Sequence, residues 1–363
     1  MKPAVARTLL AGVLLFLVAS PVLGSADLPA TLDYLKTQQN ADGGFGSGFA
    51  PESSLGSTAD VLLTIAALDG DIASFARDGH TPLTYLSGNA SAATSAGDLS
   101  KLILALVPAG ENPRTFGGVD SVAKLEALAG ADGRIGGAAD TFVSTLMAVV
   151  ALKSVQRPIP GVSLDLIRRS QQENGGWAWD GSAGTAADTN TTAYAVQALV
   201  AGGEAVDSPA VTKALAYYDA IQNEDGGWPY QNPSDYGTAT DANSTAVTVQ
   251  AILAAGQDPT GAGWTTAAAK TPYDALDGLQ NESGAWAWKE DTPADNLLAT
   301  VQAAPARAGK ALLLATMNVG EAVSAAPSTV PVTGGAGLDP AWIVTAAGLA
   351  LAAGAALLRG RKQ

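Results

Sequence analysis

The sequence contains no cysteine, and its 363 residues include a single histidine, His80. Without cysteine the chain can form no disulfide and offers no thiolate as a nucleophile or metal ligand. One histidine, placed in a predicted surface loop, cannot complete a zinc site of Cys and His and does not suggest a hydrolytic triad. Stability must therefore come from a large packed core.

Basic residues are also scarce. Lys and Arg total 20 against 34 Asp and Glu, which gives a formal net charge of −14 at pH 7. A surface this acidic repels nucleic acid and anionic lipid. The charge therefore argues against a nucleic-acid partner and otherwise indicates only solubility.

The first 26 residues have the pattern of a secretory signal peptide. Lys2 and Arg7 give a basic start, residues 9–19 are apolar, and residues 24–26 are the small residues Gly, Ser and Ala that are typical of a cleavage site. The apolar run is short for a membrane span. We therefore predict that the chain is exported and cleaved near Ala26.

The carboxyl end has the pattern of an anchor. Residues 321–340 are rich in Pro, Ser, Thr and Gly and are predicted to form an extended linker. Residues 341–358 carry no charge and suit a transmembrane helix, and the basic tail 359–363 is expected in the cytoplasm. Residues 330–334 (VPVTG) resemble the LPxTG-type sortase signal of bacterial wall proteins. A permanent membrane anchor and transfer by sortase to the cell wall both stay open, and both leave residues 27–340 outside the cell.

One short motif recurs between these ends. The pattern Q-x-x-x-G-x-(F/W) starts at Gln39, Gln171, Gln222 and Gln280. The later copies start 51 and 58 residues apart, and a period near 50 is typical of a repeat architecture. Two weaker copies, which have lost the Gln and the aromatic residue, fit in the gap after the first.

Each motif lies between two helices of different character. Amphipathic segments such as 163–172 and 211–222 precede it, and segments that are apolar nearly all round, such as 192–200 and 245–254, follow it. A helix without a polar face has to be enclosed by others. The sequence therefore predicts an all-α protein, an α/α toroid of about six helical hairpins over residues 27–320. The inner helices are expected near Asp60, Asp98, Asp140, Asp188, Asp241 and Asp295.

These repeats resemble those of squalene and oxidosqualene cyclases and of protein prenyltransferase β subunits. The α-domain of cobalamin carriers and the thioester domains of complement-type proteins share the toroid. Membership of this prenyltransferase/squalene-oxidase repeat superfamily implies that the Gln and aromatic side chains tie neighbouring helices together at the periphery. The resemblance is specific for the fold and not for one activity.

The resemblance also shows which chemistry the chain lacks. Class II terpene cyclases protonate an alkene with the middle Asp of a D-x-D-D motif, and the matching segments here begin at Asp188 and Asp241. Asn190 and Asn243 stand at the proton-donor position, and an amide cannot act as this acid. Prenyl transfer needs zinc held by Asp, Cys and His, and a thioester needs Cys. We therefore assign no catalytic residue, no metal site and no cofactor. The missing acid and zinc ligands argue against an enzyme.

An aspartate is expected at or near the start of every inner helix, where a carboxylate ordinarily caps the helix. If the inner helices are parallel, these residues meet at one rim of the ring, which suits a polar or cationic ligand, including Ca²⁺. Aromatic residues of the loops are expected at the same mouth. The predicted ligand-binding residues are Asp188, Asn190, Thr191, Asp241, Asn243, Ser244, Asp295, Trp179, Tyr230 and Trp288.

These residues favour a surface-anchored, non-catalytic toroid that binds a small molecule or a glycan. The alternative is a divergent extracellular enzyme on the same fold, terpenoid cyclase-like or carbohydrate-active. Its candidate groups are Asp188, Asp241 and Asp295 with Tyr194 and Tyr230. A passive surface scaffold or adhesin is a third reading, and the sequence does not indicate an oligomeric state.

Overall fold

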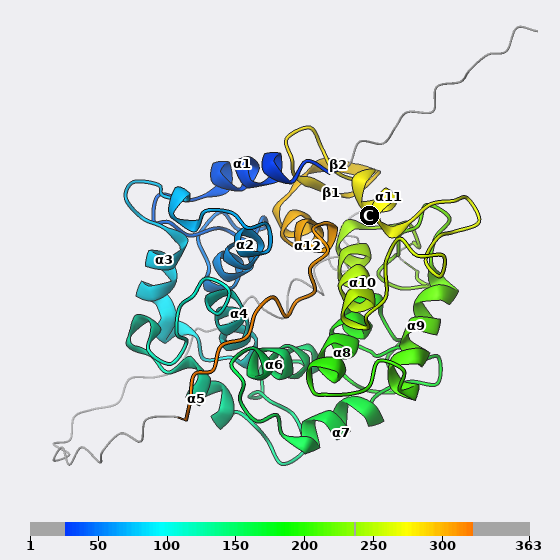
Figure 1. Cartoon of the computed structure of the whole chain (residues 1–363), viewed down its shortest axis with the longest axis horizontal. Coiled ribbons are helices and arrows are strands. Elements are labelled where there is room, and N and C mark those ends of the chain that lie inside the picture. Colours follow the sequence, from blue (N-terminus) through cyan, green and yellow to red (C-terminus); the bar gives the residue numbers. More distant parts are fainter. Residues whose placement is uncertain (1–25, 236, 322–363) are drawn as a thin grey trace, which may run out of the picture.

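A computed structural model describes residues 26–235 and 237–321. Within these residues twelve α-helices form two concentric layers around one axis (Figure 1). Each helical hairpin supplies one helix to the inner layer and one to the outer layer. The prediction of an all-α toroid with six hairpins is confirmed.

Six helices form the inner layer. They are rich in Ala, Val, Leu and Thr, and most of their side chains are buried. Each inner helix contacts the next along the chain, and the last one contacts the first, so the ring is closed. The inner helices are α2 (Leu55–Ala67), α4 (Ala96–Leu106), α6 (Phe142–Ser154), α8 (Thr189–Ala201), α10 (Ala242–Ala254) and α12 (Leu297–Arg307).

The outer layer consists of amphipathic helices, as the sequence predicts. On α7, for example, Ser163 and Ile167 are buried while Arg168 and Arg169 are exposed. A helix with one apolar face can cover the inner layer and still meet solvent. The outer helices are α1 (Leu28–Gln38), α3 (Pro82–Asn89), α5 (Ser121–Ala127), α7 (Gly161–Arg169), α9 (Pro209–Ile221) and α11 (Pro272–Asp277), with 3₁₀ turns η1 (Ile72–Ser74), η2 (Ala90–Ala92) and η3 (Phe116–Gly118).

The Gln of each motif fastens one hairpin to the next. Gln171 Nε2 donates to Gly175 O in its own loop and to Ala210 O on α9, both at 2.8 Å. The indole Nε1 of buried Trp177 donates to Ile167 O at 2.7 Å. The indole donates to a carbonyl in the last turn of α7, which would otherwise lack a donor, and the contacts match the role implied by the resemblance.

A threonine on the inner helix completes each of these loops, and the sequence analysis did not identify it. In α8, Thr192 Oγ1 accepts from Trp177 N at 2.9 Å and donates to Asp188 O at 2.7 Å. It lies four residues after the N-cap. The same position carries Thr58, Thr145, Thr245 and Thr300, and each accepts from the amide of its own loop.

The last loop closes the ring on the first helix. Gln280 Oε1 accepts from Asp27 N at 2.8 Å. Gly284 has a φ of +85°, and a Cβ there would lie 2.3 Å from the carbonyl carbon of Ala30. Glycine is required at this position, because the backbone of α1 passes directly over it.

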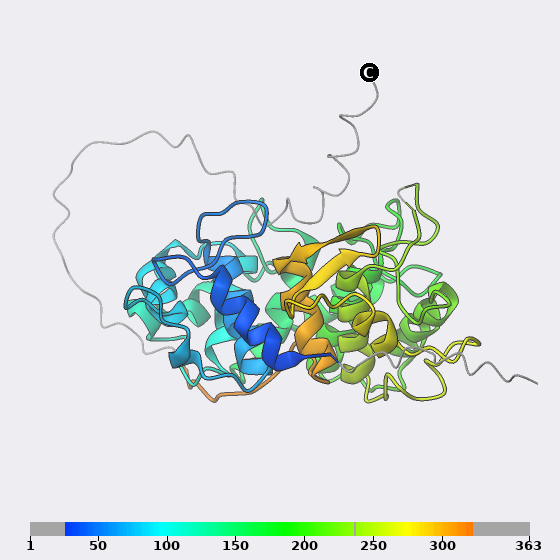
Figure 2. The same ribbon diagram turned by 90° about the horizontal axis from the view of Figure 1, so that it is seen from above.

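The two ends of the ring differ. At one end the antiparallel strands β1 (Trp286–Lys289) and β2 (Thr292–Asn296) form a short hairpin before α12 (Figure 2). At the other end an extended segment after α12, residues 310–321, crosses the ring towards α5 (Figure 1). We call this segment the strap. Alternate side chains of the strap pack on the core, namely Leu313, Ala315, Met317 and Val319.

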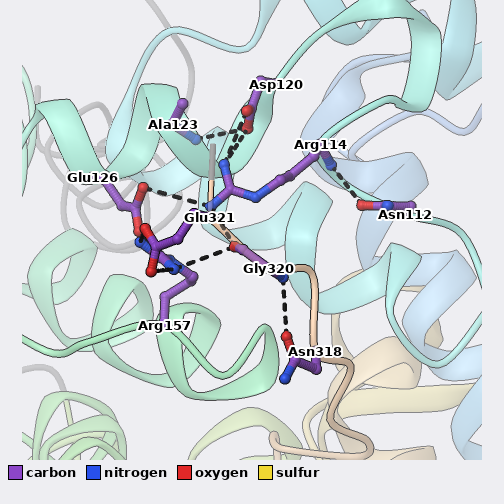
Figure 3. Close-up of polar contacts among 9 residues, drawn as sticks. All are labelled: Asn112, Arg114, Asp120, Ala123, Glu126, Arg157, Asn318, Gly320 and Glu321. Atoms are coloured by element: carbon purple, nitrogen blue, oxygen red, sulfur yellow. Dashed lines mark hydrogen bonds and ion pairs between the residues drawn. The ribbon is translucent and has the colours of Figure 1, made fainter. Parts of the chain in front are cut away.

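The strap ends in a cluster of charged groups (Figure 3). Arg157 donates to the two carboxylate oxygens of Glu321 at 2.7 and 2.8 Å and to Glu126 Oε1 at 2.5 Å. Gly320 O accepts from Arg114 Nη2 at 3.0 Å and from Arg157 Nη1 at 3.2 Å. Arg114 also pairs with Asp120 at 2.9 Å. The end of the strap is thus fixed to two loops that flank α5 and α6.

None of the helices in residues 26–235 and 237–321 has the length and apolar character needed to cross a membrane. Apart from Ala26 and Glu321, the predicted signal peptide (1–26), linker (321–340), transmembrane helix (341–358) and basic tail (359–363) lie outside the described residues.

Candidate ligand site at the mouth of the ring

The mouth of the ring is the end at which the inner helices begin. The loops after the motifs lean over the first turn of the preceding inner helix. Tyr230 O accepts from Thr189 N at 2.9 Å, and Asp140 Oδ2 accepts from Ala96 N at 3.2 Å. Neighbouring inner helices therefore start at the same end and are parallel, which is the condition for a shared rim.

Asp188 and Asp241 are the N-caps of α8 and α10, as predicted. Asp188 Oδ1 accepts from Thr191 N, and Asp241 Oδ1 accepts from Ser244 N, both at 2.7 Å. Each carboxylate also meets the positive end of its helix dipole. Both side chains are buried, so they line the wall beneath the rim and not its surface.

The expectation of an aspartate at or near the start of every inner helix is wrong for α2, and at α4 the aspartate does not cap the helix. The N-caps of these helices are Ser54 and Ser95. Asp98 lies in the first turn of α4, and Asp60 lies a full turn further along α2. A serine hydroxyl caps a helix as well as a carboxylate does, so the aspartate is free to occupy another position.

The remaining two aspartates precede a helix without capping it. Asp140 comes before Thr141, the N-cap of α6, and binds the start of α4. Asp295 lies in β2 and is exposed, and it accepts from Asn281 Nδ2 at 2.7 Å. The pKa of Tyr34, on the outer helix α1, is raised to about 12, mainly by burial of the Tyr34 hydroxyl and secondly by the charge of Asp295. Asp295 thus lies next to the outer layer.

The two capping carboxylates differ in their hydrogen bonds. Burial raises the pKa of Asp188 to about 7 and that of Asp241 to about 6. Ser244 Oγ donates to Asp241 Oδ2 at 2.9 Å, whereas Asp188 Oδ2 has no hydrogen-bond partner among the described residues. Tyr230 lies near both carboxylates. The pKa of its hydroxyl is well above the usual range, mainly because the group is buried and secondly because of the charge of Asp188, and Asp241 has a smaller effect. These three predicted residues therefore form one cluster.

The residues after the caps divide between wall and interior. Thr191 and Ser244 are buried in the wall. Asn190 and Asn243 are half-buried and lie one residue earlier on the helix, towards the axis of the ring. Asn243 Nδ2 donates to Gln302 Oε1 on α12 at 2.7 Å. Asn190 Oδ1 has no partner within the described part of the chain.

Aromatic side chains are exposed at the mouth. Trp179 is 46% exposed and Trp288 is 38% exposed, and Lys289 Nζ lies 4.4 Å from the centre of the Trp288 ring. Phe49, in the first loop, is 64% exposed and was not among the predicted residues. The second aromatic follows the first by two residues in the other copies but by four residues in this one, where Phe49 follows Phe45, so a fixed spacing would have missed it.

A deeper layer of six side chains, four of them polar, was only partly predicted, because Tyr194 was a candidate group and Asp60 was expected at the rim. The sixth residue after each inner-helix N-cap points towards the axis, because it lies about 200° around the helix from the threonine that faces the outer layer. This layer consists of Asp60, Lys101, Met147, Tyr194, Val247 and Gln302. Asp60 and Lys101 form an ion pair at 2.6 Å, and their side chains keep 26% and 31% exposure. Aligning the six helices on their N-caps would have revealed the layer.

A metal cluster is not found in the part of the chain that the structure describes. No group of three or more His, Cys, Asp or Glu side chains there could hold an ion.

Two family models match consecutive parts of the chain. The squalene-hopene cyclase C-terminal domain matches residues 138–296, and the prenyltransferase α/α toroid domain matches residues 8–141. The chain therefore belongs to the terpenoid cyclase/protein prenyltransferase superfamily of α/α toroids. A search of curated proteins found no match.

Solved structures with the same fold have different activities. The type II terpene cyclase MstE from Scytonema aligns with a TM-score of 0.55 and 15% identity, over 77% of this chain and 96% of its own. A glycosidase solved in complex with glucose aligns with a TM-score of 0.53 and 14% identity, over 77% and 95%. Haptocorrin in complex with Cbi aligns with a TM-score of 0.50 and 17% identity, over 82% and 69%. At these identities the likeness shows the fold alone.

Proposed function

We propose that this protein is a cell-surface, non-catalytic toroid that binds a polar small molecule or a glycan at its mouth. The observation that carries the proposal is the pairing of exposed tryptophans, Trp179 and Trp288, with half-buried amides, Asn190 and Asn243, at one end of the ring. Flat aromatic faces give a ligand contact area, and amides both donate and accept hydrogen bonds. The remaining walls are apolar, as in other small-molecule sites.

The similar structures support ligand binding without fixing the ligand. MstE has been solved with geranylgeranyl dihydroxybenzoate, the glycosidase with glucose and haptocorrin with Cbi. The inner face of this ring bears an ion pair and several amides, and an apolar chain would leave Asn190 Oδ1 and Gln197 Nε2 without a hydrogen bond at a cost in free energy. We therefore place the ligand among polar molecules.

The absence of an alkene-protonating acid favours binding over cyclisation. Asn190 and Asn243 hold the positions at which the related cyclases carry that acid, and an amide cannot replace it. One observation favours an enzyme of another kind. Asp188, with a pKa raised by burial to about 7, lies near Tyr230 and retains part of its proton at neutral pH. A carbohydrate-active enzyme with Asp188 as general acid is our second candidate.

The cellular setting is part of the same proposal. The signal-like start of the sequence and the linker, apolar segment and basic tail at its end support export and anchoring. The partner of the carboxyl end would be the membrane, or sortase and the cell wall. A passive scaffold is the outcome if no ligand is found.

Tryptophan fluorescence titration of the full chain tests the proposal. The probes are maltotriose, cellotriose and N-acetylchitotriose as neutral glycans, spermidine as a cation and geranylgeraniol as an apolar chain. We expect saturable binding of a glycan or of spermidine, weakened about tenfold or more by Trp288→Ala. Val206→Ala, which removes an exposed apolar side chain away from the mouth loops, is the matched control. Binding of geranylgeraniol alone, or equal losses in both variants, would contradict the proposal, and turnover of a glycan that Asp188→Asn abolishes would favour the enzyme.

A further inference from the structure

Three polar side chains form a row down the inner face of α8. Asn190, Tyr194 and Gln197 follow the N-cap Asp188 by two, six and nine residues. At 100° per residue they fall within about 60° of one another on the helix surface. We call them the α8 row. It descends from the mouth towards the strap.

The α8 row carries hydrogen-bonding groups that the protein does not use. Asn190 Oδ1 and Gln197 Nε2 are buried atoms without a partner in the described ranges, and Gln197 is only 3% exposed. The Tyr194 hydroxyl likewise makes no hydrogen bond to any described residue. An unused buried donor or acceptor costs about 1–3 kcal/mol. On the other walls the equivalent polar groups are largely paired, as Asn243 is with Gln302 and Asp60 with Lys101.

The ion pair of Asp60 and Lys101 faces this row across the ring. α2 and α8 are separated by two inner helices on either side. The pKa of Tyr194 is raised mainly by burial of the Tyr194 hydroxyl, and the charge of Asp60 nevertheless raises it further. Asp60 and Tyr194 each lie six residues after the N-cap of their helix, so both are on the side of the helix that faces the interior of the ring. The side chains of Lys101 and Asp60 keep 31% and 26% exposure.

The bottom of the row rests on the strap. Gln197 Oε1 accepts from Leu312 N at 2.9 Å, and Leu312 is buried. The strap thus closes the interior below Gln197 and leaves the mouth as the way in. The amide orientation of Gln197 is fixed by this bond, which directs Nε2 away from the strap backbone.

We propose that the α8 row, with Asp60 and Lys101 opposite, is a subsite for a neutral group rich in hydroxyls, such as the terminal sugar ring of a glycan. Each hydroxyl of a sugar both donates and accepts, and the subsite offers acceptors in Asn190 and Asp60, donors in Gln197 and Lys101, and both in Tyr194. An anion would meet Asp60 and the neighbouring Asp98. The subsite rests on the proposed function and names its ligand class.

The test uses Tyr194→Phe, which removes one hydroxyl and keeps the ring. In the full chain, titrated with the neutral glycan among maltotriose, cellotriose and N-acetylchitotriose that binds best, we expect about five- to tenfold weaker binding. Asp60→Asn, which keeps the shape of the side chain, is expected to weaken binding by a similar factor. Tyr273→Phe is the matched control, because Tyr273 is on the outer helix α11 and makes no hydrogen bond to a described residue through its hydroxyl. Unfolding curves of all three variants check that each is folded.

The outcomes separate this subsite from the proposed function. If Trp288→Ala weakens glycan binding while Tyr194→Phe and Asp60→Asn leave it unchanged, the subsite is wrong and binding at the mouth stands. If spermidine binds and no neutral glycan does, the ligand class is wrong although a polar ligand is retained. If no polar probe binds, both proposals fail.

Discussion

The mouth and the strap end of this ring are built from the same kinds of residue but use them differently. At the strap end, the charges of Arg114 and Arg157 are matched by Asp120, Glu126, Glu321 and the carbonyl of Gly320 (Figure 3), and of the two guanidinium groups only Arg114 Nε lacks a partner among the described residues. At the mouth, Asp188 Oδ2 and Asn190 Oδ1 are unmatched, and two tryptophans are exposed. Matched charges stabilise a fold, whereas unmatched polar groups are retained at a cost in stability. The difference supports our proposal that the mouth is the functional end and that the strap end is structural.

The largest effect on stability is expected at the strap end. Arg114→Met removes a side chain that is only 5% exposed and that binds Asp120 and Gly320 O together. We expect a loss of about 2–4 kcal/mol in the free energy of unfolding, because partly buried carboxylates lose their partner. Chemical denaturation measures it.

Arg134→Met is the matched control for that change. Arg134 donates to Asp180 O at the mouth end and is exposed. An exposed contact of this kind is worth at most about 1 kcal/mol. Equal losses for the two variants would remove the proposed difference between the ends.

A smaller effect, of opposite sign, is expected at the mouth. The pKa of Asp188 is raised by burial to about 7, while an unfolded Asp has a pKa of about 3.9. Between these values the folded protein holds a proton that the unfolded chain has released, so stability falls as pH rises from about 4 to about 7. Asp188→Asn keeps the cap and cannot ionise. It should raise stability at pH 8 by on the order of 2 kcal/mol and flatten the pH dependence.

Denaturation of both proteins at pH 4 and pH 8 checks this. At pH 4 the variant and the parent should differ little. A variant that is less stable than the parent at pH 8 would show that the Asp188 carboxylate stabilises the fold, contrary to the expectation of an unsatisfied group.

The smallest effect on stability is expected for the exposed aromatics. Trp179→Ala and Trp288→Ala should change the free energy of unfolding by less than about 0.5 kcal/mol, because exposed side chains contribute little to the core. Their effect should appear in ligand binding. A large loss of stability in either variant would show that the ring depends on them for packing.

The sequence predicted the ring well, because its signals are local. The motif at Gln171 and Trp177 and the apolar segment that follows are set by neighbouring residues, and the loop contacts agree with them. Asp188 and Asp241 were also placed correctly as caps.

The interior was predicted less well, because it depends on register between distant helices. Asp60 appeared to be one more cap, but Ser54 caps α2 and moves Asp60 a turn deeper, beside Lys101. Nothing near Leu312 in the sequence indicates that its amide binds Gln197, since the two residues are brought together only when the ring is complete.

Native mass spectrometry of the full chain, isolated from the cells that make it, tests the central claim most directly. We predict one polar, hydroxyl-rich molecule retained per chain and lost from the Trp288→Ala variant. A retained prenyl lipid or other apolar molecule would contradict the assignment of the mouth as a polar ligand site.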